Sequence, residues 1–330
     1  MWAWEVHDGR LNRVDLEPPP AGSDNAVIRV TSAGLCGSDV AKLTKTAIPM
    51  PPGRPWRPGH EIVGWSKDTD GHDRLAAVNP LVPCGQCARC GDGEINVCPR
   101  LQTVGWHLPG GFASWVTVPR RNAVELPSAL DEATAVLADP MAVAIHGIRC
   151  GLGGQRGRLA VIGGGALGVA SAAYGASCGW QTEVIVRDPA RVPVVVGSLG
   201  VAVRPLASVR SGEFDAVVDA AGGVDDSPFV AALDAVRDGG TIVVQTAYYP
   251  GVRLSRDLRE PIRRALTIIG SFAFCRRGGD DFTEGLDFLA RDDAWAKPFV
   301  EHRYPLADLP RALADVRGPH RPVKAVLCGA

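Results

Sequence analysis

The chain has 330 residues, of which 46% are hydrophobic and 22% are charged, a balance typical of globular proteins with one or two domains. Its formal net charge of -1 excludes a generally basic surface for nucleic acid or anionic membranes. No segment approaches roughly 18 to 20 uninterrupted apolar residues, so no membrane span is expected. The charged start, MWAWEVHDGR, does not resemble a secretory signal, and we expect a cytoplasmic protein.

Nine cysteines are present. An odd number in a chain without an export signal argues against a disulfide framework. Four of them lie between positions 84 and 98, which indicates a metal site. The remaining thiols, apart from Cys36, are expected to be core or incidental residues.

The first part of the chain is rich in Pro and Gly and carries short strand-like runs. Examples are Ala26–Thr31, Ile62–Trp65 and Ala113–Val118. Short strands punctuated by turns predict an all-β or barrel-like body.

From Asp131 the character changes. Residues 131–152 read as a helix interrupted at Pro140, and strands and helices alternate thereafter, which predicts a parallel sheet with crossover helices. The expected strands are 159–162, 183–186, 214–219, 241–244 and 266–269, with helices at 166–178 and 228–236. The tail reads as helix 282–290, strand 299–304, helix 306–316 and strand 324–327, and we expect it to complete the first domain.

Cys84, Cys87, Cys90 and Cys98 follow the pattern Cys-x-x-Cys-x-x-Cys-x7-Cys. Four thiolates at this spacing can surround a zinc ion tetrahedrally and fill every coordination position, so the expected role is structural. A redox dithiol from one Cys-x-x-Cys pair is the alternative. Two overlapping pairs with a fourth thiol favour the metal.

Three further motifs contain potential ligands. Cys36 lies in CGSD, His60 and Glu61 lie in GHE, and Asp139 lies in ADP. Each residue taken alone is more often structural, and Asp139 ahead of Pro140 could also cap a helix.

Together, the motifs resemble those of the medium-chain zinc alcohol/polyol dehydrogenase superfamily, in the same order and over essentially the whole chain. They are CGSD (36–39), GHE (59–61), the cysteine loop, GGFASWVTVP (110–119), ADPMAVAIHG (138–147), GGGALG (163–168), FDAVVDAAGG (214–223) and GGTIVV (239–244).

The resemblance implies that Cys36, His60 and Asp139 hold a catalytic zinc ion with one open position. Glu61 is similar to a family glutamate that approaches the metal during ligand exchange. Asp39 would orient His60, since metal-bound imidazoles need such a partner. Trp56, Trp106 and His107 fall where relatives line the substrate cleft, although packing is the more common role of such residues.

Zinc as a Lewis acid would lower the pKa of the alcohol, and hydride would pass to the nicotinamide. Ser38 matches the family hydroxyl that bonds the substrate oxygen and begins the proton relay. Many relatives end that relay with a histidine where this chain has Ala41. Asp139 and the missing histidine together favour a secondary, polyhydroxylated alcohol.

Gly163, Gly165 and Gly168 form a GxGxxG pattern between a predicted strand and a predicted helix. This context predicts a dinucleotide site, with Gly163, Gly165, Ala166, Leu167 and Gly168 around the pyrophosphate at the helix N-terminus.

Arg187 follows the next strand at the position that selects the cofactor, with Asp188 directly after it. An arginine can receive the 2′-phosphate of NADP, helped by Arg191, while Asp188 can bind a ribose hydroxyl of NAD. Both cofactors therefore remain open, with a slight preference for NADP. Lys324 resembles a basic family residue that reaches the cofactor phosphates, and an ordinary surface lysine is the alternative.

The sequence thus predicts an α/β protein with a GroES-like β-barrel catalytic domain (residues 1–143 and 273–330) and a Rossmann doubly wound coenzyme domain (144–272). The predicted activity is zinc-dependent, NAD(P)-linked oxidation of a secondary alcohol of polyol, sugar or aminocyclitol type, or its reverse, with one catalytic and one structural zinc ion. Relatives suggest a homodimer or homotetramer. The alternatives are a reductase of the same superfamily, or a non-catalytic zinc-stabilised dinucleotide-binding protein.

Overall fold

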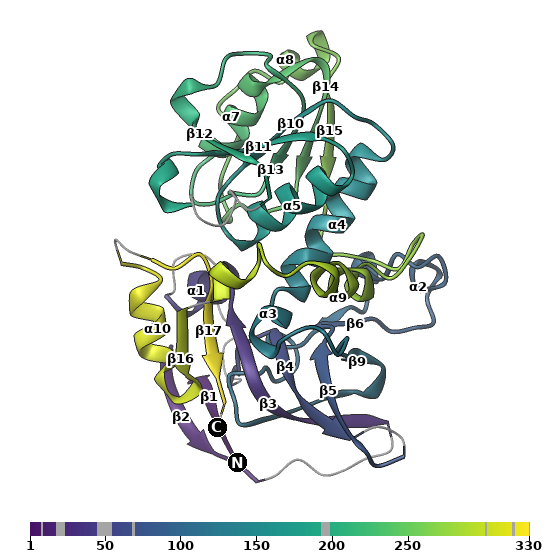
Figure 1. Cartoon of the computed structure of the whole chain (residues 1–330), viewed down its shortest axis with the longest axis vertical. Coiled ribbons are helices and arrows are strands. Elements are labelled where there is room, and N and C mark those ends of the chain that lie inside the picture. The colour runs from purple at the N-terminus through teal and green to yellow at the C-terminus, as the bar shows by residue number, and fades with distance from the viewer. Residues whose placement is uncertain are drawn as a thin grey trace. The chain divides into compact units, whose positions relative to one another are not determined.

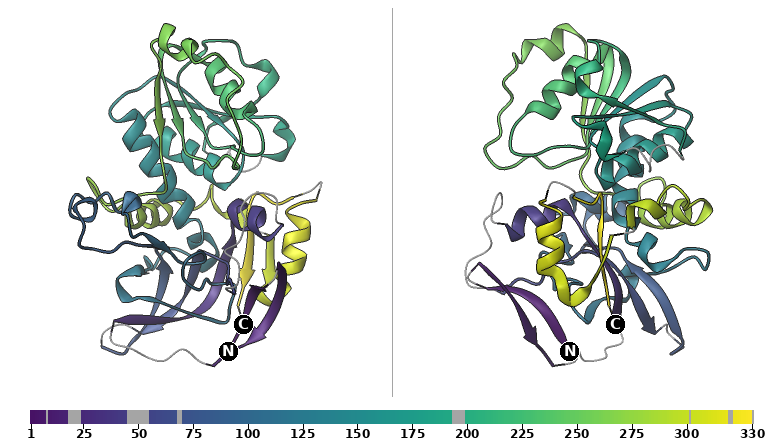
Figure 2. Two further views of the ribbon diagram at one scale, coloured as in Figure 1. Left: turned by 180° about the vertical axis from the view of Figure 1, so that it is seen from behind. Right: turned by 60° about the vertical axis from the view of Figure 1, so that its left-hand side comes forward.

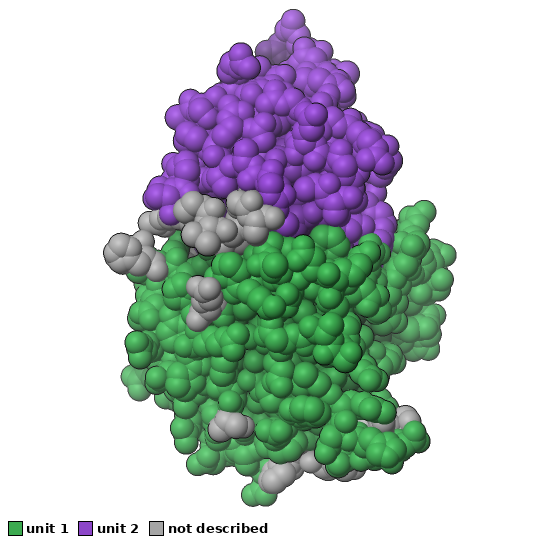
Figure 3. Space-filling model, viewed as in Figure 1, with its two compact units in different colours: residues 1–139, 276–330 green, residues 140–275 purple. Residues whose placement is uncertain are grey.

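The computed structural model describes residues 1–7, 9–17, 24–44, 55–67, 70–192, 199–300, 302–318 and 321–329, with the side chain of Arg191 left out. The chain divides into two compact units, Met1–Asp139 with Arg276–Ala330, and Pro140–Cys275 (Figure 3). The predicted domain boundaries at 143/144 and 272/273 differ from these limits by a few residues.

The first unit is built mainly of β-strands (Figure 1). Its elements are β1 (Trp2–His7), β2 (Arg10–Asp15), β3 (Asn25–Leu35), α1 (Gly37–Leu43), β4 (Glu61–Lys67), β5 (Asp73–Val78), β6 (Leu81–Val82), α2 (Ala88–Gly91), β7 (Gln102–Thr103), β8 (Trp115–Pro119), β9 (Ala123–Glu125), α3 (Glu132–Ala135), α9 (Asp281–Arg291), β16 (His302–Pro305), α10 (Leu309–Asp315) and β17 (Ala325–Cys328). Short 3-10 turns cover 95–97, 120–122, 297–300 and 306–308.

A seven-stranded sheet organises this unit, in the order β16-β17-β3-β4-β5-β9 with β8 also paired to β3. Along β3, Ala26, Ile28 and Val30 are buried on alternate positions, because successive side chains of a strand face opposite sides. They pack with buried residues such as Phe112 and Leu327. The predicted barrel-like, GroES-like body is confirmed.

The tail of the chain also belongs to this unit. Strand β17 pairs antiparallel with β3, opposite Ser32 to Leu35, and parallel with β16. The C-terminal segment therefore lies in the same compact unit as β3. The pairing of β17 with β3 places Lys324, the residue before β17, beside the end of β3.

The second unit is a parallel sheet with helices. Its elements are β10 (Arg158–Ile162), α5 (Ala166–Ser177), β11 (Gln181–Val186), a 3-10 turn at Pro189–Arg191, β12 (Ala202–Pro205), a 3-10 turn at Leu206–Ser208, β13 (Phe214–Asp219), α7 (Ser227–Ala235), β14 (Val236–Val244), α8 (Arg259–Arg263) and β15 (Thr267–Gly270). Helix α4 (Ala138–Leu152) begins at the end of the first unit and continues in the second.

The strands of the parallel sheet run in the order β12-β11-β10-β13-β14-β15. Numbered along the chain this order is 3-2-1-4-5-6, which is the Rossmann topology. Because such crossovers are right-handed, α5 and α7 cover opposite faces of the sheet (Figure 2). The strand order reverses between β10 and β13, and ligands of these folds bind at that point.

Pro140 was expected to interrupt a helix over residues 131–152, and this prediction was wrong. The break lies at 136–137, between α3 and α4. Pro140 is the third residue of α4, where the backbone N–H that proline lacks would have no partner within the helix. The proline therefore begins a helix instead of ending one.

The helices are short. The longest among the residues that the structure covers are α4 with 15 residues, α5 with 12 and α9 with 11. None of the helices traced here combines the length and the apolar character needed to cross a bilayer.

Four charged side chains connect three neighbouring strands of the Rossmann sheet. Arg158 (β10) and Arg204 (β12) both bind Glu183 (β11) and Glu213, at N–O distances of 2.8 to 3.0 Å. The Glu213 side chain is only 6% exposed. Arg204 and the backbone N–H of Arg210 lower the pKa of Glu213 to about 2, with a further contribution from Arg158.

We predict that Glu213→Gln destabilises the protein at pH 7 by roughly 1.5–3 kcal/mol, the range for hydrogen bonds to charged groups. The folded-state pKa of Glu213 lies below its ordinary value of 4.5, so its stabilisation is complete above pH 4.5 and is lost as the pH falls through about 2. Urea unfolding at pH 7, 4 and 3, followed by circular dichroism, should show the gap between wild type and variant closing over this window. Asp257→Asn, which breaks the exposed pair with Arg259, is the matched control and should change little.

Candidate active site

Cys36 lies at the junction of β3 and α1 and is the N-cap residue of that helix. Its backbone N–H donates to Oδ2 of Asp39 at 3.2 Å. The carboxylate of Asp39, on the first turn of α1, is fully buried. The thiol is therefore attached to a turn whose geometry is held by a charged hydrogen bond.

His60 immediately precedes β4, and its ring lies between two carboxylates. Nδ1 is 3.4 Å from Oδ2 of Asp39, and Nε2 is 4.0 Å from Oδ2 of Asp139. Burial disfavours the charged imidazole, but the charge and hydrogen bond of Asp39 outweigh it and raise the pKa of His60. Burial likewise raises the pKa of Asp39, and His60 outweighs that effect and lowers it. The predicted partnership of Asp39 with His60 thus has the required geometry.

Glu61 and Lys324 form a buried ion pair between β4 and the start of β17. The side chains are 1% and 3% exposed. Burial opposes the ammonium, but the Glu61 carboxylate outweighs this and raises the pKa of Lys324. The pairing argues against the surface-lysine interpretation of Lys324, and any contact with a cofactor phosphate would have to share the ammonium with Glu61.

The pair exists because the strand between them has a glycine. Gly34 on β3 is opposite Glu61 on one side and Val326 on the other. A Cβ at position 34 would lie 2.0 Å from Oε2 of Glu61 and 2.9 Å from Cε of Lys324. Any side chain at Gly34 would therefore displace the pair.

The ligand atoms of Cys36, His60 and Glu61 all lie within 4.8 Å of one another. Asp139 adds a second carboxylate, and burial raises its pKa to about 6, with Glu61 contributing and His60 opposing. The 4.0 Å between His60 Nε2 and Asp139 is too long for a hydrogen bond and leaves room for an ion between them. One thiol, one imidazole and carboxylates match the donor set of catalytic zinc, which keeps one position open.

Ser38 is half-buried in the first turn of α1, and Ala41 is buried one turn further. The methyl group of Ala41 offers no hydrogen-bond acceptor to a proton relay that begins at Ser38. Trp56 is buried and donates Nε1–H to the carbonyl oxygen of Gly105 at 2.6 Å. Trp106 stacks edge-on against Trp56 and is half-buried, while His107 is exposed.

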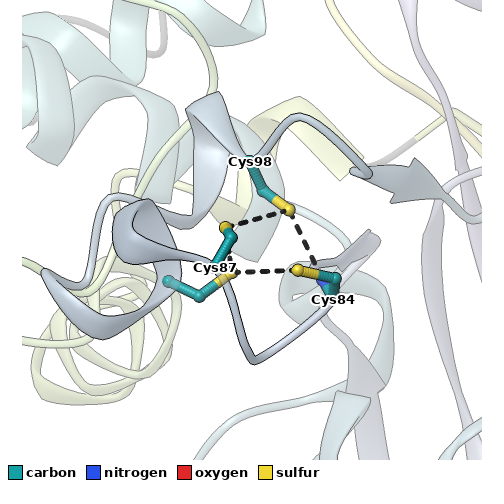
Figure 4. Close-up of side chains that lie close together, drawn as sticks. Cys84, Cys87 and Cys98 are labelled. Atoms are coloured by element: carbon teal, nitrogen blue, oxygen red, sulfur yellow. Dashed lines mark hydrogen bonds between the residues drawn. The ribbon is translucent and has the colours of Figure 1, made fainter.

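The four cysteines of the loop form one cluster whose sulfurs all lie within 4.8 Å of one another. Sulfur–sulfur distances are 3.5 Å for Cys87–Cys90 and 3.9 Å for both Cys84–Cys90 and Cys87–Cys98. Zn–S bonds of about 2.3 Å at tetrahedral angles imply sulfurs about 3.8 Å apart. Figure 4 shows the side chains of Cys84, Cys87 and Cys98 turned toward one another. The cluster can accommodate a zinc ion without rearrangement.

The glycine motif connects β10 to α5, with Gly165 as the N-cap of the helix. A Cβ at Gly165 would meet nothing within 4 Å, so the backbone is open to an approaching ligand. A Cβ at Gly168 would lie 1.9 Å from the carbonyl oxygen of Gly163, so the helix can pack this closely only with glycine there. Ala166 and Leu167 form the first turn of α5, whose free N–H groups favour an anion.

Arg187 and Asp188 directly follow β11 and are exposed. Asp188 accepts a hydrogen bond from the backbone N–H of Ala190 at 3.1 Å and caps the 3-10 turn Pro189–Arg191. The side chain of Arg191 lies outside the described part of the chain. The Arg187 charge helps to lower the pKa of Asp225, after the hydrogen bonds from Ser227, so an acidic group lies near Arg187.

Two residues near the candidate zinc and dinucleotide sites were not predicted from the sequence. Gln245, after β14, is buried and donates to the carbonyl oxygens of Val143 and Ala144 at 3.1 and 3.3 Å, while accepting from Ser171 of α5 at 2.7 Å. No pattern marks a single amide that links α4 to α5. Lys42 lies one helical turn after Ser38, and this spacing of four could have singled it out.

Residues 22–128 match the family model described as the alcohol dehydrogenase GroES-like domain. The L-galactonate-5-dehydrogenase of Escherichia coli (strain K12) is 28% identical over 312 residues, which cover 89% of this chain and 88% of the relative. The D-altritol 5-dehydrogenase of Agrobacterium fabrum is 28% identical over 320 residues, 92% of either chain.

Solved structures share the fold. One from Sinorhizobium meliloti 1021, titled as a zinc-binding dehydrogenase bound to NADP, superposes with a TM-score of 0.87 at 22% identity and covers 99% of this chain and 98% of that one. The family match, the relatives that align over most of the chain, and the folds of the two compact units agree with the motifs in the sequence. The chain is therefore similar over most of its length to dehydrogenases of the medium-chain zinc alcohol/polyol superfamily, and residues 22–128 match its GroES-like domain.

Proposed function

We propose that the chain is a zinc-dependent, NAD(P)-linked dehydrogenase that oxidises a secondary hydroxyl of a polyol or sugar derivative to a ketone, or catalyses the reverse. The observation that carries this proposal is the convergence of Cys36, His60 and Glu61 within 4.8 Å, with Asp139 facing His60. Both relatives named above are 5-dehydrogenases, and position 5 of a six-carbon polyol skeleton carries a secondary hydroxyl.

In this proposal Cys36, His60 and Asp139 would hold the catalytic ion, and Glu61, paired with Lys324, would lie within reach of it. A bound zinc ion supplies Lewis acidity that brings the pKa of a coordinated hydroxyl toward neutrality. Asp39 fixes the His60 ring with Nε2 toward Asp139. Ser38 bonds the substrate oxygen and takes up its proton. Because Ala41 offers no acceptor, the proton leaves the half-buried Ser38 hydroxyl to water.

Cys84, Cys87, Cys90 and Cys98 would hold a second ion. Since four thiolates fill every position of a tetrahedron, that site has no opening for substrate and stabilises the loop.

The dinucleotide would bind with its pyrophosphate at Gly165, Ala166 and Leu167, where the helix N-terminus offers free N–H groups. Arg187 favours the 2′-phosphate of NADP, because a guanidinium binds phosphate through paired hydrogen bonds. The engagement of Asp188 in a local cap supports this preference over NAD.

We place the protein in the cytoplasm, in a reducing environment. None of the cysteines in the described chain forms a disulfide, and the proposed zinc sites need five of them as thiolates.

We also propose that two copies associate through the edge of the Rossmann sheet. Strand β15 ends the sheet, and its outer edge has no partner among the described strands. Ile268 on this strand is 42% exposed, and Ile262 and Leu258 nearby in sequence are 79% and 72% exposed. An exposed apolar edge favours pairing with another strand, and a two-fold axis would pair β15 with its own copy. A tetramer would need a further surface.

We predict that Cys36→Ser abolishes NAD(P)-linked turnover and lowers the zinc content from two ions per chain to one, because a serine hydroxyl does not replace a thiolate ligand. Elemental analysis and absorbance at the nicotinamide band measure both. Cys178→Ser, at a half-buried cysteine outside the proposed ligand sets, should keep two ions and full activity. Full turnover by Cys36→Ser would refute the ligand assignment.

We predict that Arg187→Ala raises the KM for NADP at least tenfold and changes the KM for NAD less than twofold, because only NADP carries the 2′-phosphate. Steady-state kinetics with both cofactors measures the effect. Arg253→Ala removes another exposed arginine of the same unit and serves as control. Equal changes for the two cofactors would eliminate Arg187 as the selecting residue.

We predict that Ile268→Asp converts a dimer into a monomer, since a charge on the shared edge would be buried without a partner. Light scattering after size-exclusion chromatography gives the mass. Val224→Asp replaces a residue that is 70% exposed on another loop of the unit and should leave the dimer intact. If the wild-type chain is monomeric at micromolar concentration, the edge does not mediate association.

A further inference from the structure

Lys42 is a positively charged residue that the proposed mechanism does not use. It lies on α1, four residues after Ser38, so the two side chains project from the same face of the helix, one turn apart. The N-cap of the same helix is Cys36. The ammonium group is thus carried by the element that also positions a proposed zinc ligand and the hydroxyl proposed to bond the substrate.

An aromatic ring fixes the direction of the Lys42 side chain. Its Nζ atom lies 3.9 Å from the centre of the Trp106 ring. The turn that carries Trp106 packs on the segment that carries His60. A Cβ at Gly105 would lie 2.5 Å from the carbonyl oxygen of Gly59 and 3.2 Å from Cβ of His60. Lys42 is therefore held beside the loops of the proposed zinc site and does not extend freely into solvent.

No carboxylate within the described ranges forms an ion pair with Lys42. Asp39, whose charge acts on Lys42, uses Oδ2 to accept from the backbone N–H of Cys36 and to contact His60, and forms no ion pair with Lys42. Burial lowers the pKa of Lys42, and the charges of Asp39 and Cys36 oppose that effect only in part. After burial, Lys42 is also the second cause that lowers the pKa of His107. A half-buried ammonium without a counter-ion is a ready binding site for an anion.

We propose that Lys42 binds an anionic group of the substrate, a carboxylate or a phosphate ester, at a distance along the carbon chain from the hydroxyl that is oxidised. This inference rests on the proposed function, since Ser38 marks the end of the substrate that reacts. The two residues are about 6 Å apart along the helix axis, and the long lysine side chain adds to this reach, so the anionic group would lie several bonds from the reacting hydroxyl. A sugar acid or sugar phosphate oxidised near its far end meets this requirement. Neutral polyols gain nothing from Lys42, and positively charged aminocyclitols are repelled.

The simpler role for Lys42 is packing on Trp106 alone. In that case a neutral side chain of similar length would serve equally well, and the charge on the ligand would not matter. The two roles separate in the variants Lys42→Met and Lys42→Arg. The first keeps the length and removes the charge, and the second keeps the charge.

The test measures dissociation constants by isothermal titration calorimetry on the zinc-loaded full chain with saturating NADP. The ligands are L-galactonate, galactitol 1-phosphate and galactitol, which differ mainly in the charged group. Inorganic phosphate and acetate probe the ammonium independently of stereochemistry. We expect at least one of the two charged sugars to bind tenfold or more tightly than galactitol, and we call this ratio of dissociation constants the margin. The margin should shrink as NaCl is added. The charged sugar that binds more tightly shows whether the site prefers a carboxylate or a phosphate.

Lys42→Met should reduce this margin at least fivefold, and Lys42→Arg should retain most of it. Lys67→Met neutralises an exposed lysine of the same unit and should leave the margin unchanged. Equal affinities for charged and neutral ligands, undetectable binding of all five, or a margin that survives in Lys42→Met would overturn the inference. Turnover of secondary alcohols is recorded separately. A chain that oxidises secondary alcohols, but whose preference for charged over neutral ligands does not depend on Lys42, refutes the inference alone, and a chain that oxidises no alcohol refutes the proposed function.

Discussion

The buried carboxylate of Asp39 is the constraint on which the candidate active site depends. One oxygen of this group accepts the backbone N–H of Cys36 and faces Nδ1 of His60. Cys36 lies between β3 and α1, and His60 is the last residue before β4. A single anion therefore connects two segments separated in sequence and fixes both the thiol-bearing turn and the plane of the imidazole. Without it, the neighbouring strands would still pair, but the donor atoms would have no common orientation.

The buried charges around this group are organised in pairs. Glu61 is matched by Lys324 and Asp39 by His60, whereas Asp139 has the His60 imidazole at 4.0 Å and shares the charge of Lys324 with Glu61. The Asp139 side chain is 14% exposed, and removing its carboxylate from water raises the pKa of Asp139 to about 6, which the long contact with His60 does not offset. A divalent cation between Asp139 and His60 would offset that effect. The electrostatics of the protein alone thus leave a deficit of positive charge where the proposed catalytic ion would bind.

Much of the architecture could be predicted from local patterns. The alternation of strands and helices after residue 158 is regular enough to predict the parallel sheet, and β13 was predicted at its observed limits of Phe214 and Asp219.

Other features could not be predicted. Pro140 was misinterpreted because a proline is compatible with the first turn of a helix as well as with its end. The strands β2 and β12 were not singled out, since their residues are half-exposed or exposed and carry little apolar signal, and β1 was missed although Ala3, Trp4 and Val6 are buried. The motif residues of the site could be predicted from their spacing and from the resemblance. The pairing of Lys324 with Glu61 and the link through Gln245 could not be predicted, because both depend on contacts between strands and helices that are distant in sequence.

The fit of Glu61 and Lys324 over Gly34 ties together three positions that are far apart in the chain. The backbone of β3 passes directly beneath the ion pair. The side chains of Glu61 and Lys324 therefore fill the space that a side chain at position 34 would need. A larger residue at 34 would demand a shorter acid or base at 61 or 324, and neither charge can be lost alone without leaving the other buried and unpaired. In the evolutionary history of this chain such positions should have changed as a set or not at all. An alignment of related sequences would then show the three as correlated columns, although no two of them are neighbours in sequence.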